Sequence, residues 1–175
     1  MTHGHDHDPA CAAAHGHAGA EGQARALVAV FASPVAECLL RYGADLGFRT
    51  VLLEPDTGRS LDGVPAEREP GPYIDAGTDV VLTDHHRDEI GPLLRELLDT
   101  PARWIGIMGS PRHTGPHVRA LRELGVPDAE IARVHRPIGL NIGSQTPPEI
   151  AVATLAGLIA ERNGRPGGFT FESPG

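Results

Sequence analysis

The stretch that decides the fold is residues 26–46, ALVAVFASPVAECLLRYGADL. It opens with a short, continuous apolar run over residues 26–31, which is typical of a strand buried on both faces. Ser33 can then cap a helix whose first position is Pro34, where no intrahelical N–H bond is lost. The apolar stripe that follows predicts a helix ending at Gly47. A buried strand leading directly into a helix indicates an α/β fold with a parallel sheet.

The same alternation continues along the rest of the chain. Further buried strands are predicted at residues 50–53, 79–82 and 104–108, with a short fifth one at 133–135. Helices are predicted near residues 90–97, from Gly109-Ser110-Pro111 through Leu124, and from Pro147 to just before Gly164. Residues 56–77 are rich in Pro, Gly and charge and predict an irregular crossover. We therefore expect a Rossmann-like three-layer α/β fold with a mostly parallel sheet.

The domain organisation follows from composition. Residues 1–22 consist largely of His, Gly, Ala and Asp and are expected to form a disordered tail. Residues 23–163 are expected to form the Rossmann domain, and residues 164–175 a second disordered tail. No apolar run reaches about 18 residues, and the N-terminus has no hydrophobic signal region, so the cytoplasm is the expected location and no membrane partner is predicted.

Charge and cysteine content exclude several classes of function. The formal net charge is −8 and all 15 basic residues are arginine, which argues against nucleic acid as a partner and against Walker-type phosphate chemistry. Cys11 and Cys38 form neither a disulfide framework nor a zinc pattern. Cys38 shares an apolar helical stripe with Leu39 and Leu46, which favours a buried, inert thiol over the alternative of a reactive one.

The first turn departs from the dinucleotide-binding pattern. That pattern requires Gly-x-Gly-x-x-Gly, so that backbone can approach a pyrophosphate at the helix N-terminus. Here Phe31 and Ser33 hold the first two glycine places, and Pro34 removes one N–H group. Binding of NAD(P) is therefore not expected. Glu54 follows the second strand, where it is either a ribose-binding acid or a solvated carboxylate.

The last loop, residues 137–151 with the sequence PIGLNIGSQTPPEIA, is the strongest positive feature. It combines Gly139, Gly143 and a capping box that starts at Thr146. Unpaired N–H groups and the helix dipole predict an anion site there, with the two glycines permitting close backbone approach. The alternative is a well-capped loop that holds no ligand.

This block, together with WIGIMGS at residues 104–110 and TDHH at residues 83–86, resembles the Rossmann domain of the XdhC/CoxI family over about residues 26–162. The resemblance implies an accessory protein for maturation of a molybdenum hydroxylase of the xanthine or CO dehydrogenase type. Such a protein binds the molybdenum cofactor, assists its sulfuration or insertion, and acts as a chaperone more than as a turnover enzyme. The implied partner is the hydroxylase. The sequence leaves open whether a separate cysteine-bearing accessory protein or sulfurtransferase, or a second copy in a homodimer, is a further partner.

Three departures from the family pattern stand out. The glycine-rich first turn is replaced at Phe31 and Ser33. Many members carry an additional N-terminal domain with a functional cysteine, where this chain has a His-rich segment. In the last loop Asn141 stands where the family leads us to expect aspartate, which removes a charge and a metal or hydroxyl partner.

In parallel sheets of this kind, ligands bind outside the carboxyl ends of the strands. The expected cofactor-binding residues are those in the turns at that edge. They are Ser33, Glu54, Thr83, Asp84, His85, His86, Gly109, Ser110, Arg112, Gly139, Asn141, Gly143 and Thr146. Asp84 has the alternative role of capping the next helix. Arg112, His135 and Arg136 are further cationic contacts for an anion. The sequence shows no nucleophile together with a base and an orienting group, so no catalytic residue is predicted.

The N-terminal histidines suggest a second kind of binding. His3, His5, His7, His15 and His17 could hold a divalent transition metal weakly, although their composition favours the alternative of a flexible solubilising tail. Two alternative functions therefore remain open beside the maturation role. One is an NAD(P)-dependent oxidoreductase, and the other is a metal-handling module built on this tail.

Overall fold

The computed structural model describes residues 25–109 and 115–168. Six strands form a single parallel sheet in the order β3-β2-β1-β4-β5-β6. The strands are β1 (Ala26–Val30), β2 (Arg49–Leu53), β3 (Ala66–Glu67), β4 (Thr78–Leu82), β5 (Trp104–Ile107) and β6 (Val134–His135). This order is that of a doubly wound Rossmann fold, with its topological switch point between β1 and β4. The predicted fold class is confirmed.

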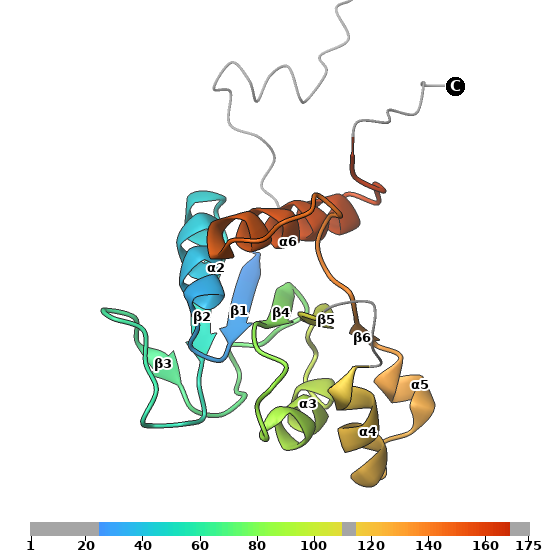
Figure 1. Ribbon diagram of the computed structural model, residues 1–175. Helices are drawn as coiled ribbons and strands as arrows, with labels where there is room; N and C mark the ends of the chain where they lie inside the picture. Colours follow the sequence, from blue (N-terminus) through green and yellow to red (C-terminus); the bar gives the residue numbers. More distant parts are fainter. Residues whose placement is uncertain (1–24, 110–114, 169–175) are drawn as a thin grey trace, which may run out of the picture.

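Helices cover both faces of the sheet (Figure 1). They are α2 (Pro34–Asp45), α3 (Ile90–Leu98), α4 (Pro116–Glu123), α5 (Asp128–Ile131) and α6 (Pro147–Arg162). Helices α2 and α6 pack side by side on one face, and α3 and α4 lie on the other. Side chains of β1 alternate between these layers, because Val28 and Val30 join the core under α3 while Leu27 joins the core under α2 and α6.

Helix α2 begins as its sequence predicts. The Ser33 hydroxyl accepts a hydrogen bond from the N–H of Ala36 at 3.0 Å, and Pro34 occupies the first turn. Cys38 is buried in the core between the sheet and α2, as expected for an inert thiol. The extension of the stripe to Leu46 is wrong, because the helix ends at Asp45 and Leu46 is 43% exposed.

The other predicted elements differ from the observed ones mainly at their ends. Residues 56–77 contain no helix, as expected, but they include the two-residue edge strand β3, which was not predicted. Helix α4 starts at Pro116 and not at Gly109, because proline suits the first turn of a helix better than its interior. The short helix α5 was also not predicted.

A buried ion cluster joins α6 to the amino end of the sheet. Asp79 is fully buried at the start of β4 and accepts hydrogen bonds from Arg103 at 2.7 Å and from Arg162 at 2.8 Å. Arg162 also donates to the carbonyl of Gly77 at 2.6 Å. These contacts fix the C-terminal end of α6 at the edge of the sheet opposite the strand carboxyl ends. The C-terminal end of α6 is therefore anchored at the amino edge of the sheet.

The predicted tails fall largely outside the described residues, so the expected division at residues 22/23 and 163/164 stays a prediction. None of the helices in residues 25–109 and 115–168 combines the length and apolar character that crossing a bilayer requires.

Candidate functional site

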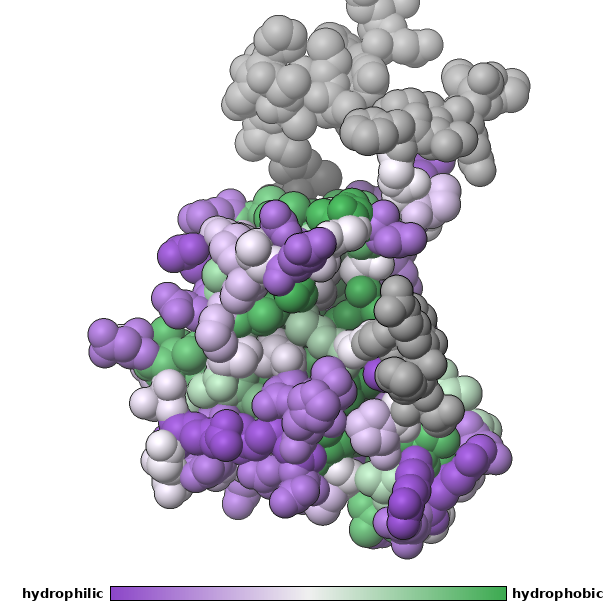
Figure 2. Space-filling view, in the orientation of Figure 1, coloured by the Kyte–Doolittle hydropathy of each residue, from purple (hydrophilic) through white to green (hydrophobic). Residues whose placement is uncertain are grey.

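A crevice of about 610 Å³ opens at the carboxyl ends of the strands, beneath the N-terminal part of α6. Its walls come from the first residues of α2, the turns after β4 and β5, the loop before α6, and α6 itself. Six of the predicted site residues line it: Thr83, His85, Gly109, Gly139, Asn141 and Gly143. Figure 2 shows apolar side chains lying between α6 and the hydrophilic band on the lower front of the molecule.

The first turn closes one side of this crevice. The hydroxyls of Ser33 and Thr83 lie 2.8 Å apart and are hydrogen-bonded. Thr83 also donates toward the carbonyls of Val30 and Phe31, each at 3.0 Å. Both hydroxyls therefore form hydrogen bonds that hold the turn after β1 against the turn after β4. This contact joins the two strands at the switch point.

Glu54 lies beneath the same turn, where a dinucleotide phosphate would approach. Its carboxylate is fully buried and accepts hydrogen bonds from the N–H of Ala32 at 2.8 Å and of Asp56 at 3.0 Å. The alternative of a solvated carboxylate is wrong, because the carboxylate is fully buried. Its hydrogen bonds to protein donors argue against the other alternative, a ribose-binding acid.

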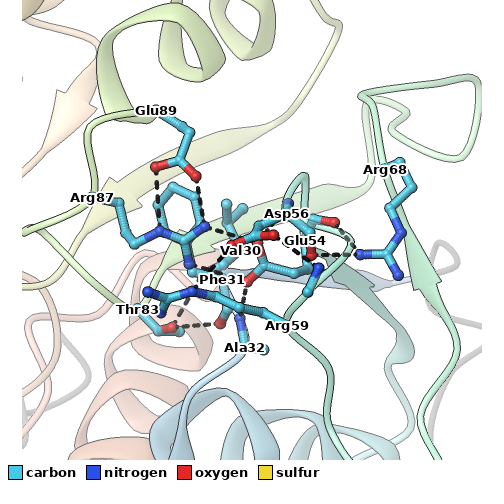
Figure 3. A network of polar contacts seen from close by, with 11 residues as sticks. Val30, Phe31, Ala32, Glu54, Asp56, Arg59, Arg68, Thr83, Arg87 and Glu89 are labelled. Atoms are coloured by element: carbon cyan, nitrogen blue, oxygen red, sulfur yellow. Dashed lines mark hydrogen bonds and ion pairs between the residues drawn. The ribbon is translucent and has the colours of Figure 1, made fainter.

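Arg87 neutralises this buried carboxylate (Figure 3). Its guanidinium donates to both oxygens of Glu54, at 3.0 and 3.2 Å, and to Glu89 at 2.7 Å. The guanidinium also stacks over the ring of Phe31, 4.5 Å from the ring centroid. Burial raises the pKa of Glu54, but hydrogen bonds from Arg87 and from the N–H groups of Ala32 and Asp56 outweigh it and lower the pKa overall.

Phe31 shows why the first turn keeps its shape without glycine. Its backbone has φ of +72°, a left-handed conformation that costs a non-glycine residue about 1–3 kcal/mol. Its side chain is fully buried and lies under Arg87, and this packing offsets the strain. The Rossmann turn is thus retained, but a carboxylate of the protein bonds the N–H of Ala32.

The N-terminus of α6 does not present the free N–H groups that were predicted. Pro147 and Pro148 have none. The Thr146 hydroxyl accepts from the N–H of Glu149 at 3.4 Å, and the Glu149 carboxylate accepts from Gln145 at 2.8 Å and from Thr146 at 3.1 Å. The predicted capping box is confirmed, and it consumes the helix-end donors that the predicted anion site would use; the anion site at the loop glycines stays a prediction. Thr146 is a structural cap outside the crevice lining.

The two loop glycines have different roles. A Cβ on Gly139 would lie 3.1 Å from the backbone of Ala153 and Thr154, so this glycine allows the loop to pack on α6. The N–H of Leu140 donates to the carbonyl of Ala153 at 3.0 Å and adds to that contact. The close approach expected of Gly139 is therefore to the helix. Gly143 has φ of +68° and faces open space in the crevice wall, as Asn141 does.

The turn after β4 carries Asp84, His85 and His86. Asp84 accepts a hydrogen bond from the N–H of His86 at 2.8 Å, and α3 begins later, at Ile90 with Glu89 as its N-cap, so the alternative helix-capping role of Asp84 is wrong. The two imidazoles lie 4.0 Å apart between centroids. Burial, together with the charges of His86 and Arg136, lowers the pKa of His85, so His85 is neutral at pH 7.

Several predicted residues lie outside the described part of the chain. They are Ser110, Arg112, His3, His5, His7, His15 and His17. Within the described residues, no group of three or more His, Cys, Asp or Glu side chains is placed to hold a metal ion. The role of Arg87 was not predicted, because 33 residues separate it from Glu54 and no local pattern pairs them.

Comparison with known proteins gives a consistent result. The family model of the XdhC Rossmann domain matches residues 27–158. An uncharacterized protein from Escherichia coli K12, YqeB, is 44% identical over 93 residues, which is 53% of this chain and 17% of YqeB. A crystal structure from Bacillus halodurans, described as a xanthine dehydrogenase, matches 82% of this chain and 46% of its own with a TM-score of 0.64 and 25% identity. The chain thus spans less than half the length of either relative.

Glu54→Gln tests the buried ion pair. Removing the charge leaves Arg87 without its buried partner, and we expect the free energy of unfolding at pH 7 to fall by on the order of 3 kcal/mol. The folded-state pKa of Glu54 is lowered, so its stabilising effect is present above about pH 4.3 and is lost as the pH falls through the folded-state value. Denaturant unfolding from pH 7 to pH 3 should therefore show a shallower loss of stability in the variant.

Glu123→Gln is the matched control, because Glu123 forms an exposed ion pair with Arg119 at 2.7 Å. It should change the free energy of unfolding by less than about 1 kcal/mol. Equal effects of the two substitutions would contradict the structural role assigned to Glu54.

The occupied first turn also predicts poor dinucleotide binding. Ala32 already donates to Glu54, Pro34 has no N–H, and Phe31 fills the place of the first glycine. Calorimetric titration with NAD(H) and NADP(H) should show no binding at low micromolar concentration. A dissociation constant in that range would overturn this account of the turn.

Proposed function

Because this chain belongs to the family of the XdhC Rossmann domain, we propose that it is an accessory protein for the maturation of a molybdenum hydroxylase of the xanthine or CO dehydrogenase type. In this role it binds the molybdenum cofactor and assists its sulfuration or insertion. The name of the Bacillus halodurans relative supports a link to xanthine dehydrogenase.

The observation that carries this proposal is the crevice at the switch point. It lies beside a first turn in which groups of the protein occupy the position that a dinucleotide phosphate would take. A volume of about 610 Å³ lies within the range of small-molecule sites. Val35, Met108 and Ile150 give it apolar walls suited to a planar ring, and His85 and Asn141 offer polar atoms to ring edges. A pterin-type ligand fits this donor set better than a dinucleotide, whose phosphate position is taken.

The cofactor would supply its redox-active molybdenum to the recipient enzyme, and the role of this chain is to hold and orient it. The hydroxyls of Ser33 and Thr83 bond each other and backbone carbonyls, so neither is poised as a nucleophile. Together with the neutral His85, this favours custody and transfer of the ligand over turnover, and it argues against the NAD(P)-dependent oxidoreductase.

Sulfuration requires a sulfur donor. Cys38 is buried in the core under α2 and α6 and does not line the crevice, and Cys11 lies outside the described residues. The proposal includes a separate cysteine-bearing protein or sulfurtransferase as the donor, which would meet the hydroxylase and this chain at the crevice. A cytoplasmic location and a homodimer are part of the same proposal.

Gly143→Asn tests whether the crevice holds the cofactor. Gly143 has a left-handed backbone that asparagine tolerates better than other residues, and its new side chain would project at the crevice wall. We expect the purified variant to retain several-fold less molybdenum cofactor and to activate its hydroxylase correspondingly less. Cofactor content and hydroxylase activity are the two measurements.

Gly164→Asn is the control, because Gly164 has a similar φ of +62° and equally open surroundings beyond the end of α6. Equal loss in both variants would point to backbone strain, and undiminished cofactor retention by Gly143→Asn would show that the crevice is not the site. If cells lacking the protein kept a fully active hydroxylase, the proposed function itself would be refuted.

A further inference from the structure

Arg136, at the end of β6, is held between two glycines that leave room for its guanidinium. A Cβ on Gly109 would lie 2.4 Å from Nη2 of Arg136 and 2.6 Å from Nε. A Cβ on Gly115 would lie 3.0 Å from Nη1 of the same side chain. Gly109 follows β5 and Gly115 caps α4, so the guanidinium lies at the carboxyl edge of the sheet between these two elements.

This position lies between two cavities. One is the crevice, which Gly109 and His85 line. The other is a separate cavity of about 470 Å³ beside α4, which we call the α4 cavity; His117 and Arg136 line it. Pro137, the residue after Arg136, lines both cavities. Burial lowers the pKa of both His85 and His117, and the charge of Arg136 adds to the lowering on each side, after that of His86 in the case of His85.

His117 has an unused polar atom at this place. The residue is only 4% exposed, and its Nδ1 has no hydrogen-bond partner. A buried imidazole nitrogen without a partner is uncommon and calls for an explanation such as a ligand. The site of a Cβ on Gly115 lies 2.3 Å from Nδ1, so His117 and Arg136 border the same small space beside that glycine.

We propose that Arg136 and His117 bind the phosphate monoester group of a ligand whose organic part lies in the crevice. A guanidinium suits this group because its planar donors match phosphate oxygens in pairs, and the imidazole can donate one further N–H group to a phosphate oxygen. Donors at the N-terminus of α6 are consumed by its capping box, so that helix end is not the phosphate site. Assigning the group to the pterin phosphate rests on the proposed function, whereas the phosphate site itself does not.

Titration of the full chain with inorganic phosphate and with phenyl phosphate tests this site. We expect both to bind at pH 7, and Arg136→Gln to weaken binding by about tenfold or more, because hydrogen bonds to charged groups contribute strongly. Arg136→Lys should fall between, since an ammonium cannot bond two oxygens in the same planar fashion. Melting temperatures measured in parallel show whether each variant is folded.

Arg122→Gln is the matched control. Arg122 also lines the α4 cavity, but it is exposed and forms an ion pair with Asp128 at 2.8 Å. The variant loses the same charge and should change phosphate affinity less than about twofold. Equal weakening by Arg122→Gln and Arg136→Gln would mean that only diffuse charge attracts the anion and would overturn the site. Absence of phosphate binding by the unaltered chain would overturn it as well.

Gly115→Ala keeps the proposal falsifiable if Arg136→Gln does not fold. Gly115 has φ of −63°, which alanine adopts without backbone strain, but the new methyl group would overlap the His117 ring at 2.3 Å and must displace it beside Arg136. We expect about tenfold weaker phosphate binding, and unchanged binding in the folded variant would refute the proposal. His117→Phe, which keeps a buried aromatic ring of somewhat larger volume without a ring nitrogen, should weaken binding severalfold; unchanged affinity in the folded variant would remove His117 from the site.

The outcome is separable from that of the proposed function. If Arg136→Gln lost phosphate but kept the molybdenum cofactor, the phosphate site would stand and its assignment to the pterin would fall. If phosphate bound as expected but the chain activated no hydroxylase, the site would stand and the maturation role would fall.

Discussion

The buried pair of Glu54 and Arg87 is the interaction on which the carboxyl edge of this fold depends. Glu54 follows β2 and Arg87 lies in the segment between β4 and α3, so their contact crosses beneath β1. Glu54 holds the N–H of Ala32, and Arg87 covers the ring of Phe31. An uncompensated charge at this depth would cost several kcal/mol, so the pair ties the three strands to one another at their carboxyl ends.

This pair explains how a Rossmann fold keeps its first turn after losing its glycines. In a dinucleotide-binding turn, the ligand phosphate supplies negative charge to the helix N-terminus. Here the Glu54 carboxylate supplies that charge from inside the protein. The turn no longer depends on a ligand for its electrostatic balance, and the remaining space at the switch point is open to a different molecule.

Local chemistry was predictable from the sequence, and pairing across the sheet was not. The Ser33 cap and the Thr146 to Glu149 capping box each involve residues within four positions, and both were predicted correctly. The alternation of strands and helices, and with it the fold class, was also predicted correctly, because each element is encoded by a local pattern of apolar residues. The partner of Glu54 lies 33 residues away, so its burial could not be inferred. The lack of free donors at the N-terminus of α6 was foreseeable, because Pro147 and Pro148 visibly have no N–H group. His117 gave only a weak signal, since its burial depends on how α4 packs.

The contact between the last loop and α6 has a kinetic consequence. Gly139 and Gly157 pack backbone against backbone, and the N–H of Leu140 bonds the carbonyl of Ala153, so the loop and helix form one rigid unit. The far end of that helix is anchored by Asp79. Fast motion of the loop independent of the helix is therefore not expected. Any change in the shape of the crevice at this wall should follow slower, collective displacement of the helix.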